Sequence, residues 1–271
     1  MKRNIPLLIV LAALAGCANI SPQSRWQHAA QLADKAGWQK LRLTAGHFVL
    51  AAYVPKTISR QDTLTVYIEG DGFSWVTRSQ PSSDPTPRHP VGLEMALRHP
   101  HGAAAYLARP CQYAEAADAR NCQPAYLTDR RFAAEVIEAS DEAIGALKQR
   151  AGAARLILVG YSGGGAVAAL VAARRNDVVQ LITIAGNLDH RAWTEQHGVP
   201  QLTGSLNPAD EWRMLMNLPQ RHFVGARDEV VGKAVLDAYA ARFPADRRPQ
   251  VIVVPDFDHV CCWAEKWGEL L

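Results

Sequence analysis

The sequence contains 271 residues, of which 48% are hydrophobic and 20% are charged. This length and apolar content predict one globular domain with a substantial core. The formal net charge is +3, and it falls to about +1 if Lys2 and Arg3 are removed with an N-terminal signal. A net charge this small gives no reason to expect nucleic acid or a strongly acidic partner.

The N-terminal segment has the pattern of an export signal. Lys2 and Arg3 precede an apolar run, Ile5–Ala15, that is too short to cross a bilayer as a stable helix. This arrangement is typical of a signal peptide. The following Leu14-Ala15-Gly16-Cys17 is similar to a bacterial lipobox, which implies that residues 1–16 are removed. An ordinary cleaved signal peptide with an incidental cysteine is the alternative.

By the same resemblance, Cys17 becomes the lipidated first residue of the mature protein. Several acyl chains hold a protein stably on a membrane, where a single chain does not. Ala18 follows the cysteine in place of an aspartate, which favours outer-membrane sorting within a bacterial cell envelope. We therefore expect a lipidated tether at 17–23 and one domain at 24–271.

Strands and helices alternate along that domain. Runs with alternating, β-branched or aromatic residues predict strands at 40–44, 48–54, 64–68, 103–108, 155–159, 178–185, 221–224 and 250–254. Apolar residues at helical spacing predict helices at 91–98, 130–149, 165–174, 233–243 and 260–270. The stretch 186–220 is irregular. This order predicts an α/β fold with a largely parallel sheet covered by helices on both faces.

The most informative motif joins the strand at 155–159 to the helix at 165–174. Gly160-Tyr161-Ser162-Gly163-Gly164 fits the pattern G-x-S-x-G, and it resembles the nucleophile elbow of α/β hydrolases. The serine of such an elbow sits in a strained turn, so small residues two positions away let the strand and helix close together. The helix N-terminus beneath it then favours developing negative charge.

The same glycines fit a second pattern. Gly163–Ala168 matches G-x-G-x-x-A, a dinucleotide-binding fingerprint. That motif needs an acidic residue at the end of the next strand, whereas the strand at 178–185 ends in Ala185-Gly186-Asn187. A dinucleotide is therefore the weaker prediction, and we expect neither an organic cofactor nor a metal.

Candidate catalytic residues follow the ends of three predicted strands, in the order Ser162, Asp228 and His259. Ligands bind outside the carboxyl ends of the strands in such sheets. A serine hydroxyl is a weak nucleophile, so His259 would take its proton as general base. Asp228 would hold the imidazole in the required tautomer. Neighbouring carboxylates at Glu229, Asp256 and Asp258 remain alternatives to Asp228.

This chain order is that of α/β hydrolases. Over nearly all of its mature length the sequence resembles a serine hydrolase of the α/β-hydrolase fold. Within that superfamily it looks like bacterial lipoprotein α/β hydrolases, with Tyr67–Trp75 and Gly204–Pro208 as further suggestive segments. The resemblance implies that any lid lies in 186–220, where Trp193, His197 and Trp212 are candidate pocket residues. At most a small cap is expected.

The resemblance also implies an oxyanion hole made of two backbone N–H groups. One would come from Gly163, directly after the nucleophile, and the other from Gly72 or Phe73, in the loop after the strand at 64–68. Related hydrolases usually carry His-Gly-x at this loop. Asp71 stands in the histidine position, and it has no assigned role.

Four cysteines remain after Cys17, and export makes their oxidation the expected state. Cys111 and Cys122 bracket a polar loop, so a disulfide between them is the simplest pairing. Cys261 and Cys262 are adjacent, and a vicinal disulfide, free thiols or pairing with the first loop all remain open.

The sequence therefore predicts an exported, membrane-anchored serine hydrolase that cleaves carboxylic esters through an acyl-enzyme. Its expected partners are a small-molecule or lipid ester and a membrane bound through the lipid anchor. Thioesterase, peptidase and lipase activities are alternatives on the same triad. A non-catalytic envelope lipoprotein that uses the fold as a binding module is the alternative from another class.

Overall fold

The structure is a computed structural model that describes residues 21–57 and 60–271. The predicted signal peptide and Cys17 lie outside the described residues. A helix begins at Pro22, slightly before the predicted start of the domain. Within the described residues, no helix is both long enough and apolar enough to cross a membrane.

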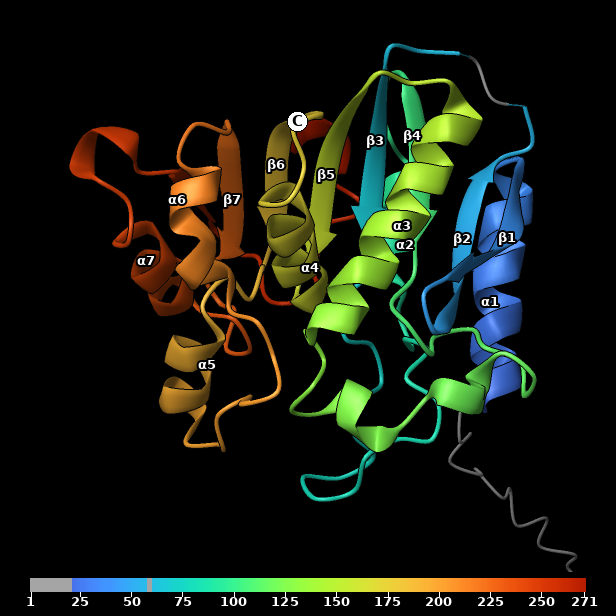
Figure 1. The fold of residues 1–271 in the computed structure, drawn as a ribbon, viewed down its shortest axis with the longest axis horizontal. Helices are drawn as coiled ribbons and strands as arrows, with labels where there is room; N and C mark the ends of the chain where they lie inside the picture. The colour runs from blue at the N-terminus through green and yellow to red at the C-terminus, as the bar shows by residue number, and fades with distance from the viewer. Residues whose placement is uncertain (1–20, 58–59) are drawn as a thin grey trace, which may run out of the picture.

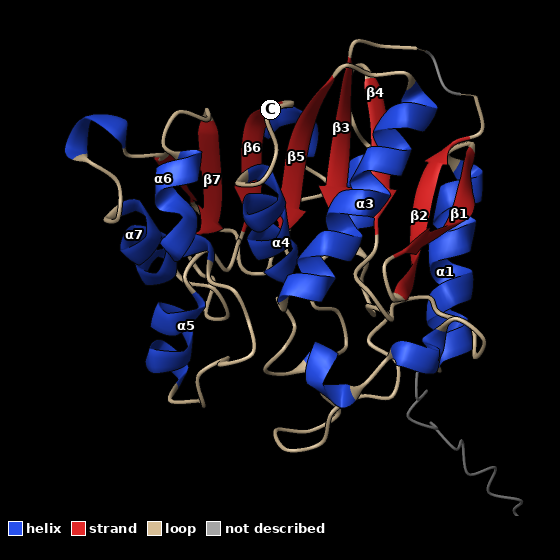
Figure 2. Ribbon diagram, in the orientation of Figure 1, coloured by secondary structure: helices blue, strands red, loops and turns tan. Residues whose placement is uncertain are grey.

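An eight-stranded sheet forms the centre of the domain, in the order β1-β2-β4-β3-β5-β6-β7-β8 (Figures 1 and 2). The β1–β2 and β2–β4 pairs are antiparallel, and the remaining pairs are parallel. The strands are β1 Trp38–Ala45, β2 Phe48–Pro55, β3 Thr63–Ile68, β4 Ala103–Leu107, β5 Arg155–Tyr161, β6 Val178–Ile184, β7 Gln220–Gly225 and β8 Gln250–Val254.

Helices cover both faces of this sheet. Helices α3 and α4 lie across the face seen in Figure 1, while α1 and α2 pack in the hydrophobic cluster of the opposite face. The helices are α1 Pro22–Lys35, α2 Val91–Leu97, α3 Ala134–Ala151, α4 Gly163–Ala172, α5 His190–His197, α6 Trp212–Leu215, α7 Lys233–Ala240 and α8 Trp267–Leu270. Short 3₁₀ turns occupy 119–121, 124–127, 208–211 and 245–247.

The predicted closing helix at 260–270 is wrong in extent, because only Trp267–Leu270 is helical. Asp258 accepts hydrogen bonds from the backbone N–H groups of Val260 and Cys261, and these bonds hold that segment in a turn. The turn carries Trp263 into the core, where its side chain is fully buried. The segment before Trp267 therefore forms a turn that buries Trp263, and it does not continue the helix.

Two disulfides are present. Cys111 is bonded to Cys122, as predicted, and Cys261 is bonded to Cys262. Cys111 follows the end of β4 and Cys262 follows the end of β8. Both pairs therefore lie in segments that follow the carboxyl ends of strands.

We expect the Cys111→Ser/Cys122→Ser protein to be less stable than the parent by about 3 kcal/mol, because the bond closes a loop of about 12 residues in the unfolded chain. Urea unfolding monitored by tryptophan fluorescence measures this difference. The matched control is Cys261→Ser/Cys262→Ser, whose bond closes almost no loop and should contribute less. Equal losses in the two proteins would contradict the loop-entropy explanation.

Candidate active site

The turn between β5 and α4 holds Ser162 in a strained conformation. Its φ is 52° and its ψ is −122°, in a region that residues with a side chain rarely adopt. The Ser162 N–H donates to the carbonyl of Ile184 at 2.9 Å, and its carbonyl accepts from the N–H groups of Gly165 and Asn187. These bonds fix the turn from both sides, and they support the strained backbone.

Glycines on either side of Ser162 allow this turn to form. A Cβ atom at Gly160 would lie 2.3 Å from the carbonyl oxygen of Gly164, and one at Gly164 would lie 2.3 Å from the carbonyl oxygen of Ile68. Both distances are shorter than any van der Waals contact. The two outer glycines of the G-x-S-x-G pattern are therefore explained by the close approach of backbone segments.

The structure brings Ser162, His259 and Asp228 together. The Nε2 atom of His259 lies 3.0 Å from Oγ of Ser162. The Nδ1 atom lies 2.9 Å and 3.1 Å from the two carboxylate oxygens of Asp228. Ser162 follows β5, Asp228 follows β7 and His259 follows β8, so the carboxyl ends of three parallel strands supply the three side chains.

The Asp228 side chain is fully buried. Its Oδ1 atom accepts hydrogen bonds from the backbone N–H groups of Val230 and Val231, at 2.9 and 2.8 Å. These two bonds, together with the contacts to His259, set the orientation of the carboxylate beside the imidazole. The carboxylate is thus fixed in place before any substrate arrives.

The three alternative carboxylates have other environments. Glu229 is exposed to solvent. Asp256 forms an ion pair with Arg227, and Asp258 accepts the N–H groups of the turn that follows it. Among the candidates, Asp228 is the residue that contacts the His259 ring.

The backbone N–H groups near Ser162 include two candidates for an oxyanion hole. The N–H of Gly163 begins α4 and has no hydrogen-bond acceptor among the described residues. The N–H of Gly72 likewise has no acceptor in the described part of the chain. By contrast, the N–H of Phe73 donates to the carbonyl of Pro85 at 2.9 Å. Gly163 and Gly72 are therefore better placed than Phe73 to serve as donors.

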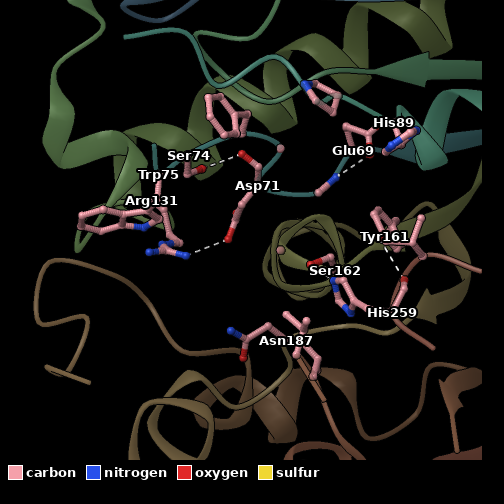
Figure 3. A pocket seen from close by; sticks show the side chains of 18 of the residues that line it. Glu69, Asp71, Ser74, Trp75, His89, Arg131, Tyr161, Ser162, Asn187 and His259 are labelled. Carbon is pink, nitrogen blue, oxygen red and sulfur yellow. Dashed lines mark hydrogen bonds and ion pairs between the residues drawn. The ribbon is translucent and has the colours of Figure 1, made fainter. Parts of the chain in front are cut away.

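A cavity of about 400 Å³ opens over Ser162 and His259 (Figure 3). Apolar side chains at its mouth include Trp75, Val230 and Val260, all of which are partly exposed. The irregular stretch 186–220 contributes Asn187 and Trp193 to the cavity wall.

Two other residues proposed for the pocket lie elsewhere. The His197 Nε2 atom is 2.9 Å from the carbonyl of Val230, and His197 does not line the cavity. The Trp212 ring packs edge-on against Phe243. Within the described residues, no group of three or more His, Cys, Asp or Glu side chains is arranged to bind a metal ion.

Several solved structures have a fold similar to that of this chain. Est1E from Butyrivibrio proteoclasticus is 14% identical, with a TM-score of 0.57 over 85% of this chain and 95% of that chain. The Pyrococcus furiosus esterase Pf2001 is 13% identical, with a TM-score of 0.58 over 86% and 89%. XC6422 from Xanthomonas campestris, an α/β serine hydrolase without a lid, is 15% identical, with a TM-score of 0.51 over 82% and 86%.

The chain has the α/β-hydrolase fold. At these identities the similarity concerns the fold alone, and it confirms the fold class predicted from the sequence. A scan against protein-family models and a search of curated proteins found no match to this chain.

Glu69 is a buried carboxyl that the sequence did not identify as important. It directly follows β3, at the start of the loop that carries Gly72, and its side chain lines the cavity (Figure 3). Its Oε1 atom accepts the N–H groups of Gly70 and Gly92, and its Oε2 atom accepts the Tyr106 hydroxyl at 3.1 Å. Glu69 therefore ties the candidate oxyanion loop to the start of α2.

Asp71 acquires a role that the sequence could not assign. Its Oδ1 atom is 2.9 Å from Nη1 of Arg109, and its Oδ2 atom is 2.8 Å from Nη1 of Arg131. Burial alone would raise the pKa of Asp71, but the guanidinium groups of Arg131 and Arg109 outweigh it and hold that pKa below its ordinary value. Asp71 also lies directly against Gly163, where an added Cβ atom would be 2.1 Å from Oδ1.

The Glu69 carboxyl should make the stability of the α/β-hydrolase domain depend on pH. Burial raises the pKa of Glu69 to about 7, from an ordinary value of 4.5. At a pH between these two pKa values, Glu69 keeps its proton in the native state but has released it in the unfolded state. The free energy of unfolding should therefore fall as the pH rises, by up to about 1.4 kcal/mol per pH unit from this group.

Glu69→Gln has no carboxyl at this position, so it lacks this pH dependence. From pH 5 to pH 7.5 the parent should therefore lose more free energy of unfolding than Glu69→Gln. Urea unfolding of both proteins at the two pH values measures it. Glu138→Gln, which changes an exposed carboxyl on α3, is the control and should keep the dependence of the parent. A difference between parent and Glu69→Gln that does not change with pH would argue against a raised pKa.

Proposed function

We propose that this protein is an exported, lipid-anchored serine hydrolase that cleaves carboxylic esters. The observation that carries the proposal is the continuous hydrogen-bonded chain from Ser162 through His259 to the buried Asp228. A serine in a strained turn, beside an imidazole and at the base of a cavity, is the arrangement required for nucleophilic catalysis.

The chemistry follows from these positions. His259 Nε2 takes the hydroxyl proton as Ser162 Oγ attacks the ester carbonyl carbon, and the carbonyl oxygen becomes an oxyanion. The N–H groups of Gly163 and Gly72 would bind that oxyanion. His259 then gives the proton to the departing alcohol oxygen, which leaves an acyl group on Ser162. A water molecule, deprotonated by His259, attacks the acyl carbon, and the acid is released as Ser162 regains its proton.

Asp228 stays ionised throughout this cycle. It accepts a hydrogen bond from the Nδ1–H group of His259, and it stabilises the positive charge that forms on the ring after Nε2 takes the serine proton. Its own negative charge is balanced by the N–H groups of Val230 and Val231. Asp228 is therefore a positioning and electrostatic group, and it does not exchange protons.

The position of α1 supports a membrane-facing site. The N-terminal end of α1 lies at the edge of the sheet where the carboxyl ends of the parallel strands meet (Figure 1). Cys17 is five residues before Pro22 in the sequence. A lipid anchor at Cys17 would therefore hold this edge, and the cavity on it, close to the membrane.

We expect Ser162→Ala to abolish both turnover and covalent labelling. The purified domain would be treated with a fluorophosphonate, and the adduct located by peptide mass spectrometry. The parent should carry one adduct on Ser162, and the variant should lose p-nitrophenyl ester hydrolysis by about 10⁴-fold or more, because no other group replaces the nucleophile.

Ser79→Ala is the matched control, because Ser79 is exposed on a loop and lies outside the cavity. It should label and turn over like the parent. A folded parent protein without any adduct would reject the proposed hydrolase and favour a binding module. Ester hydrolysis by Ser162→Ala at the rate of the parent would reject the role of this serine.

Lipid anchoring has a separate test. The full chain would be expressed in a bacterium with a lipoprotein export pathway, and the cells fractionated. We expect the parent in the membrane fraction and Cys17→Ser in the soluble periplasmic or secreted fraction, since the thiol that would carry the lipid is gone. The same distribution for both proteins would show that Cys17 is not an anchor.

A further inference from the structure

The charged groups that line the cavity are unevenly balanced. Two acidic side chains, Glu69 and Asp71, line it together with the basic side chains of Arg88, His89 and Arg131. Glu69 is bound by backbone N–H groups and a hydroxyl, and Asp71 is held between two arginines. Neither carboxylate therefore balances Arg88.

Asp71 is the single carboxylate shared by two buried guanidinium groups. Arg109 is 5% exposed and Arg131 is 8% exposed, and within the described residues each pairs with Asp71 alone. One positive charge in this cluster is thus in excess. A buried excess charge is costly unless a ligand or a partner compensates it.

Arg131 directs this excess towards the cavity. Its Nε atom donates to the carbonyl of Thr128 at 2.7 Å, and its Nη1 atom contacts Asp71. Its Nη2 atom has no hydrogen-bond acceptor in the described part of the chain. Figure 3 shows Arg131 beside Asp71 on the cavity wall, on the side of Asp71 that is away from Ser162.

Arg88 adds a second cation at the mouth of the same cavity. The guanidinium carbon lies 4.0 Å from the centre of the Phe73 ring, so stacking holds it in place. No carboxylate among the residues 21–57 and 60–271 lies within ion-pair distance of Arg88. An exposed arginine without an acidic partner is free to bind a ligand.

We propose that the ester substrate carries an anionic group, a carboxylate or a phosphate, which Arg131 and Arg88 bind while Ser162 attacks the ester carbonyl. The inference rests on the proposed function, because it identifies the substrate class of the same site. Arginine suits this task, since its planar guanidinium matches carboxylate and phosphate geometry.

The test compares pairs of esters of similar size, in which one member carries a carboxylate and the other is neutral. On the acyl side the pair is mono-p-nitrophenyl succinate and p-nitrophenyl butyrate. On the alcohol side it is 4-acetoxybenzoate and its methyl ester. We expect the anionic member of at least one pair to have a kcat/KM about tenfold higher than its neutral partner, after correction for the uncatalysed rates. This preference should shrink as the ionic strength rises.

The arginine variants test whether these two residues produce the preference. In Arg88→Gln, and more strongly in Arg131→Gln, the ratio of anionic to neutral kcat/KM should fall towards one. Arg88 is exposed, so its variant remains informative if Arg131→Gln does not fold. Arg78→Gln is the matched control, because Arg78 is exposed nearby but outside the cavity, and it should keep the ratio of the parent.

Dispersed phosphatidylglycerol and phosphatidylcholine with identical acyl chains distinguish a lipid headgroup from a soluble anion. Faster cleavage of the anionic lipid that depends on Arg88 would identify the lipid as a source of the charge. Two results would overturn the inference if hydrolysis still depends on Ser162. One is a preference for the neutral member of every pair, and the other is a preference for the anionic member that does not change in either arginine variant. Failure to hydrolyse any of these esters would instead count against the proposed function.

Discussion

The close approach of α4 to the ends of β3 and β5 is the constraint on which the site depends. Only glycine at 160 and 164 permits it, because any side chain there would overlap a backbone carbonyl group. The approach leaves Ser162 with a positive φ of 52°, and its side chain lines the cavity. It also places the N–H of Gly163 next to the loop that carries Gly72. Nucleophile and candidate oxyanion donors thus arise from the same packing.

The two carboxylates of the site, Asp228 and Asp71, have different partners. On one side, Asp228 is fully buried, is held by two N–H groups and contacts His259, and within the described residues it forms no ion pair with an arginine. On the other side, Asp71 is held by Arg109 and Arg131 against Gly163. One carboxylate can therefore support an imidazolium, while the other organises positive charge around the cavity. The proposed general base, His259, and the arginines proposed to bind an anion therefore occupy different parts of one cavity.

The sequence predicts those features of the site that arise from residues close together in the chain. The strand at 155–161 and the glycine-rich turn were recognisable because strand, serine and helix are contiguous, and the chain order located Asp228 and His259. Helix α1 was missed because its apolar stripe is weak, with Arg25 among its few buried residues. The anchoring of Asp71 could not be predicted, since its partners are 38 and 60 residues away and only the folded sheet joins them. The prediction of Phe73 as an oxyanion donor meets the same limit, because its N–H donates to the carbonyl of Pro85 across the loop.

The most direct test of the account is a crystal structure of the protein after reaction with a small alkyl phosphonate, whose tetrahedral phosphorus mimics the ester intermediate. We predict phosphorus bonded to Ser162 Oγ and the phosphonyl oxygen about 2.7–3.1 Å from the backbone nitrogens of Gly163 and Gly72. His259 should remain between Ser162 and Asp228. A phosphonyl oxygen that points into solvent, away from both glycines, would contradict the claim that this turn and this loop together form the catalytic site.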